Sequence, residues 1–144
     1  MELEKLLRSV EMFAGLTDEE FTQLAGIFQQ RPLSDGEILF QQGDPGDSLC
    51  LIQRGFVEIV AESDGQEKTL VNLGPGQSVG EMALIDRGTR SATVRAATGD
   101  TIVAVVSREA FEDLCEQNTN IGYKVMRNIA ADLSFRIRHR GLDA

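Results

Sequence analysis

One short stretch of the sequence combines a carboxylate, a guanidinium and a hydroxyl, which are groups that can hold a small polar ligand. Gly80 and Glu81 open this stretch, and Arg90 and Ser91 follow one loop later. A guanidinium can bind two oxygens of a phosphate at once, and a carboxylate can accept a hydrogen bond from a hydroxyl group. These residue types indicate a ligand that carries both an anion and a hydroxyl. The residues alone also leave open an ordinary ion pair between Glu81 and Arg90 that bridges a loop.

Backbone amides in the same stretch add to this pattern. Gly80 permits a close backbone approach, and the residues after it favour a helical turn. The first amides of such a turn have no partner within the helix and point outward, so they suit an anion. The amides concerned belong to Glu81, Met82 and Ala83.

The chain has few of the residues that metal sites and catalytic nucleophiles require. The sequence has one histidine, His139, and two cysteines, Cys50 and Cys115, with no Cys-x-x-Cys pair. Zinc and iron–sulfur centres need more ligands than this, and a nucleophile needs a nearby base. Both cysteines lie among apolar residues, so we interpret them as core residues. We expect no metal, no cofactor and no enzymatic activity.

The charge balance excludes another class of partner. The chain carries 23 acidic against 14 basic residues, a net charge of −9, which disfavours non-specific nucleic-acid binding. No apolar run approaches the ~20 residues that span a bilayer, and the first residues lack the features of a signal peptide. We therefore expect a cytoplasmic protein without a membrane segment.

The elements that must position the candidate residues begin with two amphipathic helices within residues 1–30. Leu3, Leu6 and Leu7 give the first helix an apolar stripe at helical spacing. Thr17 and Glu20 then form the pattern of a capping box at the start of the second helix.

Residues 31–106 read as short strands separated by turns. Turn signals recur roughly every 8–11 residues, which is typical of an antiparallel sandwich or barrel. No helical segment separates the strands, so a jelly roll (a double-stranded β-helix) fits better than a parallel sheet. The predicted strands are residues 38–40, 49–52, 57–61, 69–73, 92–96 and 101–106.

Helices return over residues 107–144, with Ser107 as the N-cap and an interruption at residues 118–120. The last helix carries an apolar band broad enough to cover a sheet and also to face a second copy of the chain in a homodimer. Its row at i+4 spacing comprises Ile121, Val125, Ile129, Leu133 and Ile137. The whole chain, residues 1–144, is thus predicted to be one domain, mainly β with flanking α-helices.

This combined pattern resembles the cyclic-nucleotide-binding domain family, which includes the bacterial catabolite activator protein and the regulatory subunits of cyclic-AMP-dependent kinase. The similarity covers nearly the whole chain. The motifs that carry it are F-A-G-L-T-D-E-E at 13–20, G-E-x-L-F-x-Q-G-D-P-G-D-S-L at 36–49, I-x-x-G-x-V at 52–57, L-G-P-G-Q-S-V-G-E at 73–81, G-E-M-A-L-I at 80–85, R-S-A-T-V at 90–94 and S-R-E-A-F at 107–111.

The resemblance implies a phosphate-binding cassette over residues 79–92. In it Glu81 accepts a hydrogen bond from the ribose 2′-OH and Arg90 holds the cyclic phosphate. The amides around Met82, Ala83 and Ser91 complete the phosphate site, next to Gly80. Two departures from the family pattern occur: Val79 stands where an aromatic residue is common, and Gly88-Thr89 replace a frequent proline, which predicts a more mobile loop.

The resemblance also implies contacts with the base and a helical lid. Val71 and Leu73 fall where the family packs the base, and Ile59 is a weaker candidate. The final helix closes over the base in this family, and Arg136 falls near the lid position. Arg136 equally fits a solvated basic residue that interacts with the end of the helix dipole.

The function implied is a sensor that binds a cyclic nucleotide, moves its C-terminal helical lid and acts on an effector protein that the sequence does not identify. Ser91 favours cyclic AMP over cyclic GMP, because a hydroxyl at this position occurs in cyclic-AMP-binding bacterial relatives. The same hydroxyl also fits a hydrogen bond with a syn guanine, as a threonine makes in the family's cyclic-GMP binders. The alternatives are a structural dimerisation domain without a ligand and the sensor fragment of a longer transcription regulator. Too few residues follow Leu133 for a helix-turn-helix, so no DNA-binding domain is expected in this chain.

Overall fold

The computed structural model describes residues 2–140, which belong to two compact units. One unit is the continuous segment Ile27–Phe111, and the other combines the two ends of the chain, up to Gly26 and from Glu112 onward. The elements in chain order are α1 (Glu2–Arg8), the 3-10 helix η1 (Glu11–Phe13), α2 (Asp18–Ala25), β1 (Gln29–Leu33), β2 (Ile38–Phe40), β3 (Ser48–Arg54), β4 (Val57–Ser63), β5 (Gln66–Leu73), β6 (Ser78–Val79), the 3-10 helix η2 (Glu81–Leu84), β7 (Thr93–Ala96), β8 (Thr101–Ser107), α3 (Arg108–Gln117) and α4 (Thr119–His139).

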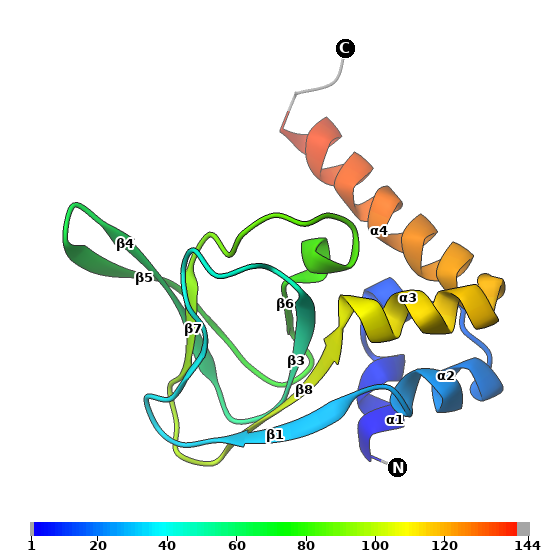
Figure 1. The fold of residues 1–144 in the computed structure, drawn as a ribbon, viewed down its shortest axis with the longest axis horizontal. Coiled ribbons are helices and arrows are strands. Elements are labelled where there is room, and N and C mark those ends of the chain that lie inside the picture. Colours follow the sequence, from blue (N-terminus) through cyan, green and yellow to red (C-terminus); the bar gives the residue numbers. More distant parts are fainter. Residues whose placement is uncertain (1, 141–144) are drawn as a thin grey trace. The chain divides into compact units, whose positions relative to one another are not determined.

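Two four-stranded sheets form the unit Ile27–Phe111 (Figure 1). One has the strand order β1-β8-β3-β6 and the other β2-β7-β4-β5, and every pairing is antiparallel. This arrangement confirms the predicted β-sandwich of the jelly-roll class. The consecutive strands β3 and β4 belong to different sheets, and residues of both sheets meet in the core.

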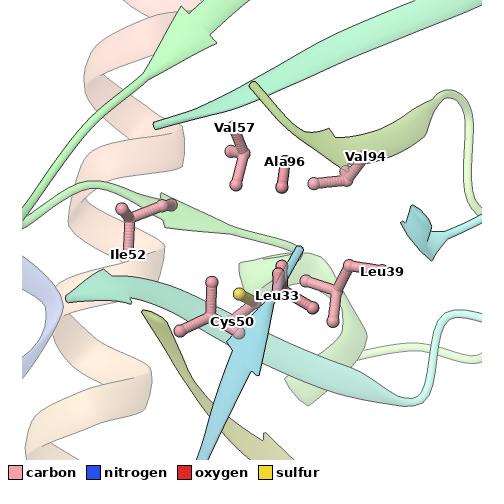
Figure 2. Close-up of a cluster of buried hydrophobic side chains, with 8 residues drawn as sticks. Leu33, Leu39, Cys50, Ile52, Val57, Val94 and Ala96 are labelled. Atoms are coloured by element: carbon pink, nitrogen blue, oxygen red, sulfur yellow. The ribbon is translucent and has the colours of Figure 1, made fainter. Parts of the chain in front are cut away.

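The core of this unit lies between the two sheets. Figure 2 shows buried side chains from both sheets pointing toward one another. Cys50 is among them, as predicted, and burial raises the pKa of its thiol to about 12, so the thiol stays protonated at neutral pH. The core cluster comprises Leu33, Leu39, Cys50, Ile52, Val57, Val94, Ala96 and Val103.

All six predicted strands are present, but two further strands escaped prediction. β1 contains three polar residues and Pro32, and it lies at the edge of its sheet, where a residue without an amide donor is tolerated. β1 begins at Gln29, so the boundary between helices and strands that was predicted at residue 31 is wrong and lies inside this strand. β6 has only two residues, which is too short for an alternating pattern.

The helical unit contains the predicted capping box at the start of α2. The Thr17 hydroxyl accepts a hydrogen bond from the Glu20 amide, and the Glu20 carboxylate accepts one from the Thr17 amide. The same carboxylate oxygen lies 2.7 Å from the ammonium nitrogen of Lys124 on α4. Glu20 therefore stabilises the start of one helix and joins it to another.

The apolar row of α4 divides into two parts. Ile121, Val125 and Ile129 are buried, whereas Leu133 is only partly buried and Ile137 is 44% exposed. The predicted i+4 row thus covers a buried face along the first half of the helix only. Its second half carries exposed apolar side chains together with a basic end.

We expect Glu20→Gln to lower the free energy of unfolding by about 1–2 kcal/mol at pH 7, because it removes a buried, charge-assisted hydrogen bond. Hydrogen bonding to Lys124 is the main reason that the pKa of Glu20 lies below its ordinary value. Such a carboxylate contributes stability above its unfolded-state pKa and loses it as the pH falls through the folded-state pKa.

The measurement is urea unfolding, followed by circular dichroism, of the wild type and of Glu20→Gln at neutral and acidic pH. The difference between the two proteins should shrink as the pH falls below about 4, where the wild-type carboxylate also becomes neutral. Glu19→Gln, at an exposed neighbouring position, is the control and should change little. A difference that does not depend on pH would contradict the assigned role of the charge.

Candidate functional site

The candidate stretch begins where β6 ends, at a glycine with an unusual backbone conformation. Gly80 has φ 86°, in the left-handed region, and η2 follows directly, as the predicted helical turn. A Cβ atom at Gly80 would lie 2.4 Å from Nη1 of Arg90 and 2.9 Å from the Ser48 carbonyl oxygen. Both the conformation and the lack of space therefore require glycine.

Arg90 is held by hydrogen bonds at both ends, its backbone to the β2–β3 loop and its side chain to the start of β3. Its amide donates to the Asp44 carbonyl at 2.7 Å, and its carbonyl accepts from the Gly43 amide at 2.9 Å. At the far end of its side chain, Nη2 donates to the Ser48 carbonyl at 2.7 Å and approaches the Ser48 hydroxyl at 3.1 Å. The position of the guanidinium is therefore fixed by two separate segments.

The charge of Arg90 is largely removed from water. The residue is 8% exposed, and this burial lowers the pKa of its guanidinium, while the charges of Asp47 and Asp44 act in the opposite direction. Among residues 2–140, no carboxylate forms an ion pair with Arg90, so the simple Glu81–Arg90 ion pair is not formed. A buried cation without a paired carboxylate remains available to an anionic ligand.

These residues surround a cavity of about 250 Å³ within the unit Ile27–Phe111. Its lining combines the Arg90 cation, the residues of the η2 turn, two hydroxyls and an apolar wall. The lining residues are Gly46, Ile59, Val79, Gly80, Glu81, Met82, Ala83, Asp86, Gly88, Thr89, Arg90, Ser91, Ala92 and Val94. The cavity can therefore accept a ligand with both an anionic and an apolar part.

Most of the predicted site residues meet at this cavity. All six predicted cassette residues line it, from Gly80 to Ala83 and at Arg90 and Ser91, and so does Ile59. Val71 and Leu73 are outside the described lining, although Val71 pairs with Ile59 across the β4–β5 ladder.

Arg136 belongs to the helical unit, where its guanidinium lies 2.8 Å from the Asp132 carboxylate on the same helix. This i,i+4 ion pair involves two side chains that are each about half exposed, with exposed fractions of 50% and 46%. The contact fits the solvated reading of Arg136, and a role in a lid stays a prediction.

The amide of Ala83 does not point freely into the cavity. It donates to the Gly80 carbonyl at 2.9 Å, because a 3-10 turn closes hydrogen bonds three residues apart. The expectation of an unpaired Ala83 amide is therefore wrong for this conformation. Ala83 contributes its position on the cavity wall, and a ligand bond from its amide would require the turn to open.

Two features of the site were not predicted from the sequence. The Phe40 ring lies against the Arg90 guanidinium, and Nη1 of Arg108 donates to the carbonyls of Gly46, Ala83 and Asp86 at 3.0, 3.2 and 2.9 Å. Arg108 follows the N-cap Ser107, whose hydroxyl accepts from the Ala110 amide as predicted. Arg108 was not singled out from the sequence, because bonds from a side chain to backbone carbonyls follow no residue-type pattern.

A family model described as "Cyclic nucleotide-binding domain" matches residues 30–118. The chain belongs to this family. The cyclic AMP receptor protein of Thermus thermophilus is 36% identical over 138 residues, which cover 95% of this chain and 62% of that protein. The family is one of ligand-binding domains, so the observed cavity lies in a domain of the expected kind.

Solved structures agree with this membership. The N-terminal domain of a transcriptional regulator from Streptomyces coelicolor matches with a TM-score of 0.85 and 30% identity, covering 91% of this chain and 94% of that chain. The regulatory domain of Toxoplasma gondii PKA with cAMP matches with a TM-score of 0.71 and 27% identity, covering 78% and 42% of the two chains. The chain spans less than two thirds of several full-length members of the cyclic nucleotide-binding family.

The described part of the chain offers neither a metal-binding cluster nor a membrane-spanning helix. Within residues 2–140, no group of three or more histidine, cysteine, aspartate or glutamate side chains is placed to hold a metal ion. Over the same residues, no helix has the length and apolarity needed to cross a membrane.

We expect Gly80→Ala to destabilise the protein by about 2 kcal/mol or more, because it adds a Cβ atom at positive φ and against the Arg90 guanidinium. Gly36→Ala is the matched control, since Gly36 has φ +81° but nothing within 4 Å of its Cβ position. Thermal unfolding of both variants separates strain from steric clash. Equal losses in the two variants would show that contact with Arg90 does not matter.

Proposed function

We propose that this domain is a sensor whose cavity binds a cyclic nucleotide, with cyclic AMP preferred over cyclic GMP. The observation that carries the proposal is the buried Arg90 guanidinium without a paired carboxylate, on the same cavity as Glu81. In this proposal Arg90 binds the cyclic phosphate and Glu81 accepts a hydrogen bond from the ribose 2′-OH. No catalytic step is proposed.

Charge supports a small, singly charged ligand. A chain with a net charge of −9 repels polyanions at long range, so an anion is held only where a cation is concentrated locally. Arg90 supplies that cation in a site of low dielectric, where its attraction for a phosphate is stronger than in water. The apolar wall, which includes Ile59, Val79 and Val94, offers a surface for the base.

Ser91 and the relatives support cyclic AMP as the ligand. Ser91 lines the cavity next to Arg90 and is an exposed residue. One relative is named as a cyclic AMP receptor protein, and one similar structure is that of a kinase regulatory domain with cAMP. We assign the same ligand to this chain, with Val71, Leu73 and Ile59 as candidates for contact with the base.

The signal is proposed to leave the cavity through α3 and to move the C-terminal helices as a lid. Arg108, the first residue of α3, bonds to carbonyls of three segments at the cavity, and its amide also donates to the Asp47 carbonyl at 2.8 Å. A ligand that shifts the η2 turn would therefore act on the start of α3, and α3 leads on to α4. The effector is a partner protein or a further segment of the same polypeptide.

Isothermal titration of the wild type with cyclic AMP and with cyclic GMP tests the proposal. Glu81→Ala should weaken binding by about 1.5–3 kcal/mol, or roughly 10- to 150-fold, the range for hydrogen bonds to charged groups. Arg90→Ala should weaken it further, because the phosphate charge then lacks a counter-charge. Cyclic AMP should bind more tightly than cyclic GMP, and Ser91→Ala should reduce that preference.

The outcomes separate the parts of the proposal. No binding of either nucleotide by the wild type would overturn the sensor function. Binding with a silent Glu81→Ala would overturn only the ribose assignment. Glu62→Ala, at an exposed position outside the cavity lining, controls for the change of net charge.

Self-association through α4 is a second proposal, carried by a separate observation. The helix has an apolar stripe at heptad spacing, distinct from its buried row at Ile121, Val125 and Ile129. Two of its members, Tyr123 and Ile137, are 66% and 44% exposed. A stripe repeating every three and four residues is the seam of a coiled coil. The stripe comprises Tyr123, Met126, Ala130, Leu133 and Ile137.

We expect the wild type to form a homodimer through this stripe and the double variant Tyr123→Glu, Ile137→Glu to be monomeric. Light scattering coupled to size-exclusion chromatography over a range of concentrations measures the mass. Ala131→Glu, exposed and off the stripe, should leave the dimer intact. A monomeric wild type at all concentrations would contradict dimerisation without affecting the ligand proposal.

A further inference from the structure

The guanidinium of Arg90 has an aromatic ring on one of its faces. Its Cζ atom lies 3.7 Å from the centre of the Phe40 ring, well inside the distance at which a cation is attracted to an aromatic face. Phe40 is the last residue of β2, opposite Val94 of β7, and it packs against the buried core cluster. The ring is therefore anchored by the sandwich itself and not by a loop.

Other neighbours border the nitrogen atoms of the guanidinium. Nη2 donates to Ser48, and Nη1 lies over Gly80, where no side chain fits. Nε is buried and has no hydrogen-bond partner in the described chain. Phe40 is thus the neighbour that covers a face, while polar or backbone atoms border the nitrogen atoms.

The division between face and edges matters for an anionic ligand. Guanidinium donors all lie in the plane of the group, so a phosphate binds at an edge and cannot use a face. A carboxylate that fixed Arg90 would occupy an edge and compete with the ligand. An aromatic ring stabilises the cation from the face and leaves the donors available.

We infer that Phe40 is a positioning residue for the ligand: its ring sets the plane of the Arg90 guanidinium and stabilises the buried cation without occupying its donors. The inference rests on the proposed role of Arg90 in binding the phosphate. It goes beyond that role by assigning part of the affinity to a residue that lies outside the cavity lining.

The alternative role for Phe40 is that of a core residue whose only contribution is apolar volume. The variants Phe40→Leu and Phe40→Tyr separate the two roles, because leucine keeps the apolar burial and loses the ring face, whereas tyrosine keeps the ring. Leu39→Met is the matched control, a change of similar volume at a core position on the same strand.

The first experiment is titration of the four proteins with cyclic AMP. Phe40→Leu should bind about 5- to 30-fold more weakly, the effect of losing a desolvated cation–π contact, while Phe40→Tyr and Leu39→Met stay within about threefold of the wild type. In an Arg90→Ala background, followed by ligand-observed NMR, Phe40→Leu should have less than about a twofold effect. An equal effect in both backgrounds would assign Phe40 a merely structural role and overturn the inference.

A second measurement does not depend on the ligand. NMR of the Arg90 side chain in the free protein should show an Nε–H signal shifted by the ring current in the wild type and in Phe40→Tyr, and not in Phe40→Leu. If this signal is the same in Phe40→Leu as in the wild type, Phe40 does not position Arg90. Failure of the wild type to bind any cyclic nucleotide would instead overturn the proposed function, and the two failures are thereby distinguished.

Discussion

The burial of one positive charge sets the arrangement of most of the cavity. Arg90 is removed from water without an ion-paired carboxylate, so its guanidinium depends on the uncharged groups that touch it as well as on the nearby charges of Asp47 and Asp44. Ser48 supplies two oxygens, Phe40 supplies a ring face, and Gly80 supplies the space that a side chain would deny. Three residues that are far apart in the sequence thus serve the same purpose, which is to accommodate the buried guanidinium of Arg90.

Backbone hydrogen bonds carry this arrangement to the rest of the β-sandwich. The amide and the carbonyl of Arg90 are bonded to the β2–β3 loop, and Arg108 bonds to the same loop and to the η2 turn. Backbone groups hold their positions more rigidly than long side chains, which lose rotamer freedom when they are fixed. The cavity is consequently built on the strands and their connections, with Arg108 joining it to the first turn of α3.

Parts of the structure that depend on local sequence patterns could be predicted, and parts without such a pattern could not. Strands with alternating burial, the capping box of Thr17 and Glu20, and the turn after Gly80 are local patterns, and all were predicted. β1 was missed because Pro32 and polar neighbours hide an edge strand, and β6 because two residues carry no period. The Glu81 and Arg90 pairing on one cavity could be predicted from residue types, but not the absence of an ion pair between them.

Several contacts that the sequence did not predict involve backbone atoms or a ring face, which residue types do not reveal. Arg108 binds carbonyls, the Ala83 amide is consumed by its own turn, and Phe40 reads as an ordinary apolar strand residue. For the base, the family resemblance pointed to Val71 and Leu73 and, as a weaker candidate, to Ile59; of these, Ile59 belongs to the described cavity lining. Ile59 and Val71 are paired directly across the β4–β5 ladder, so the base candidates lie on neighbouring strands.

The contrast between a buried cation and an acidic chain has a consequence for selection among anions. A chain with a net charge of −9 presents a repulsive field that grows with the valence and length of an approaching polymer. The electrostatic repulsion of a monoanion is small, and at close range the monoanion is attracted by Arg90. RNA or DNA is repelled at every phosphate. We therefore expect the domain to favour monoanions over polyanions, and added salt to screen the repulsion outside the cavity more than the attraction inside it.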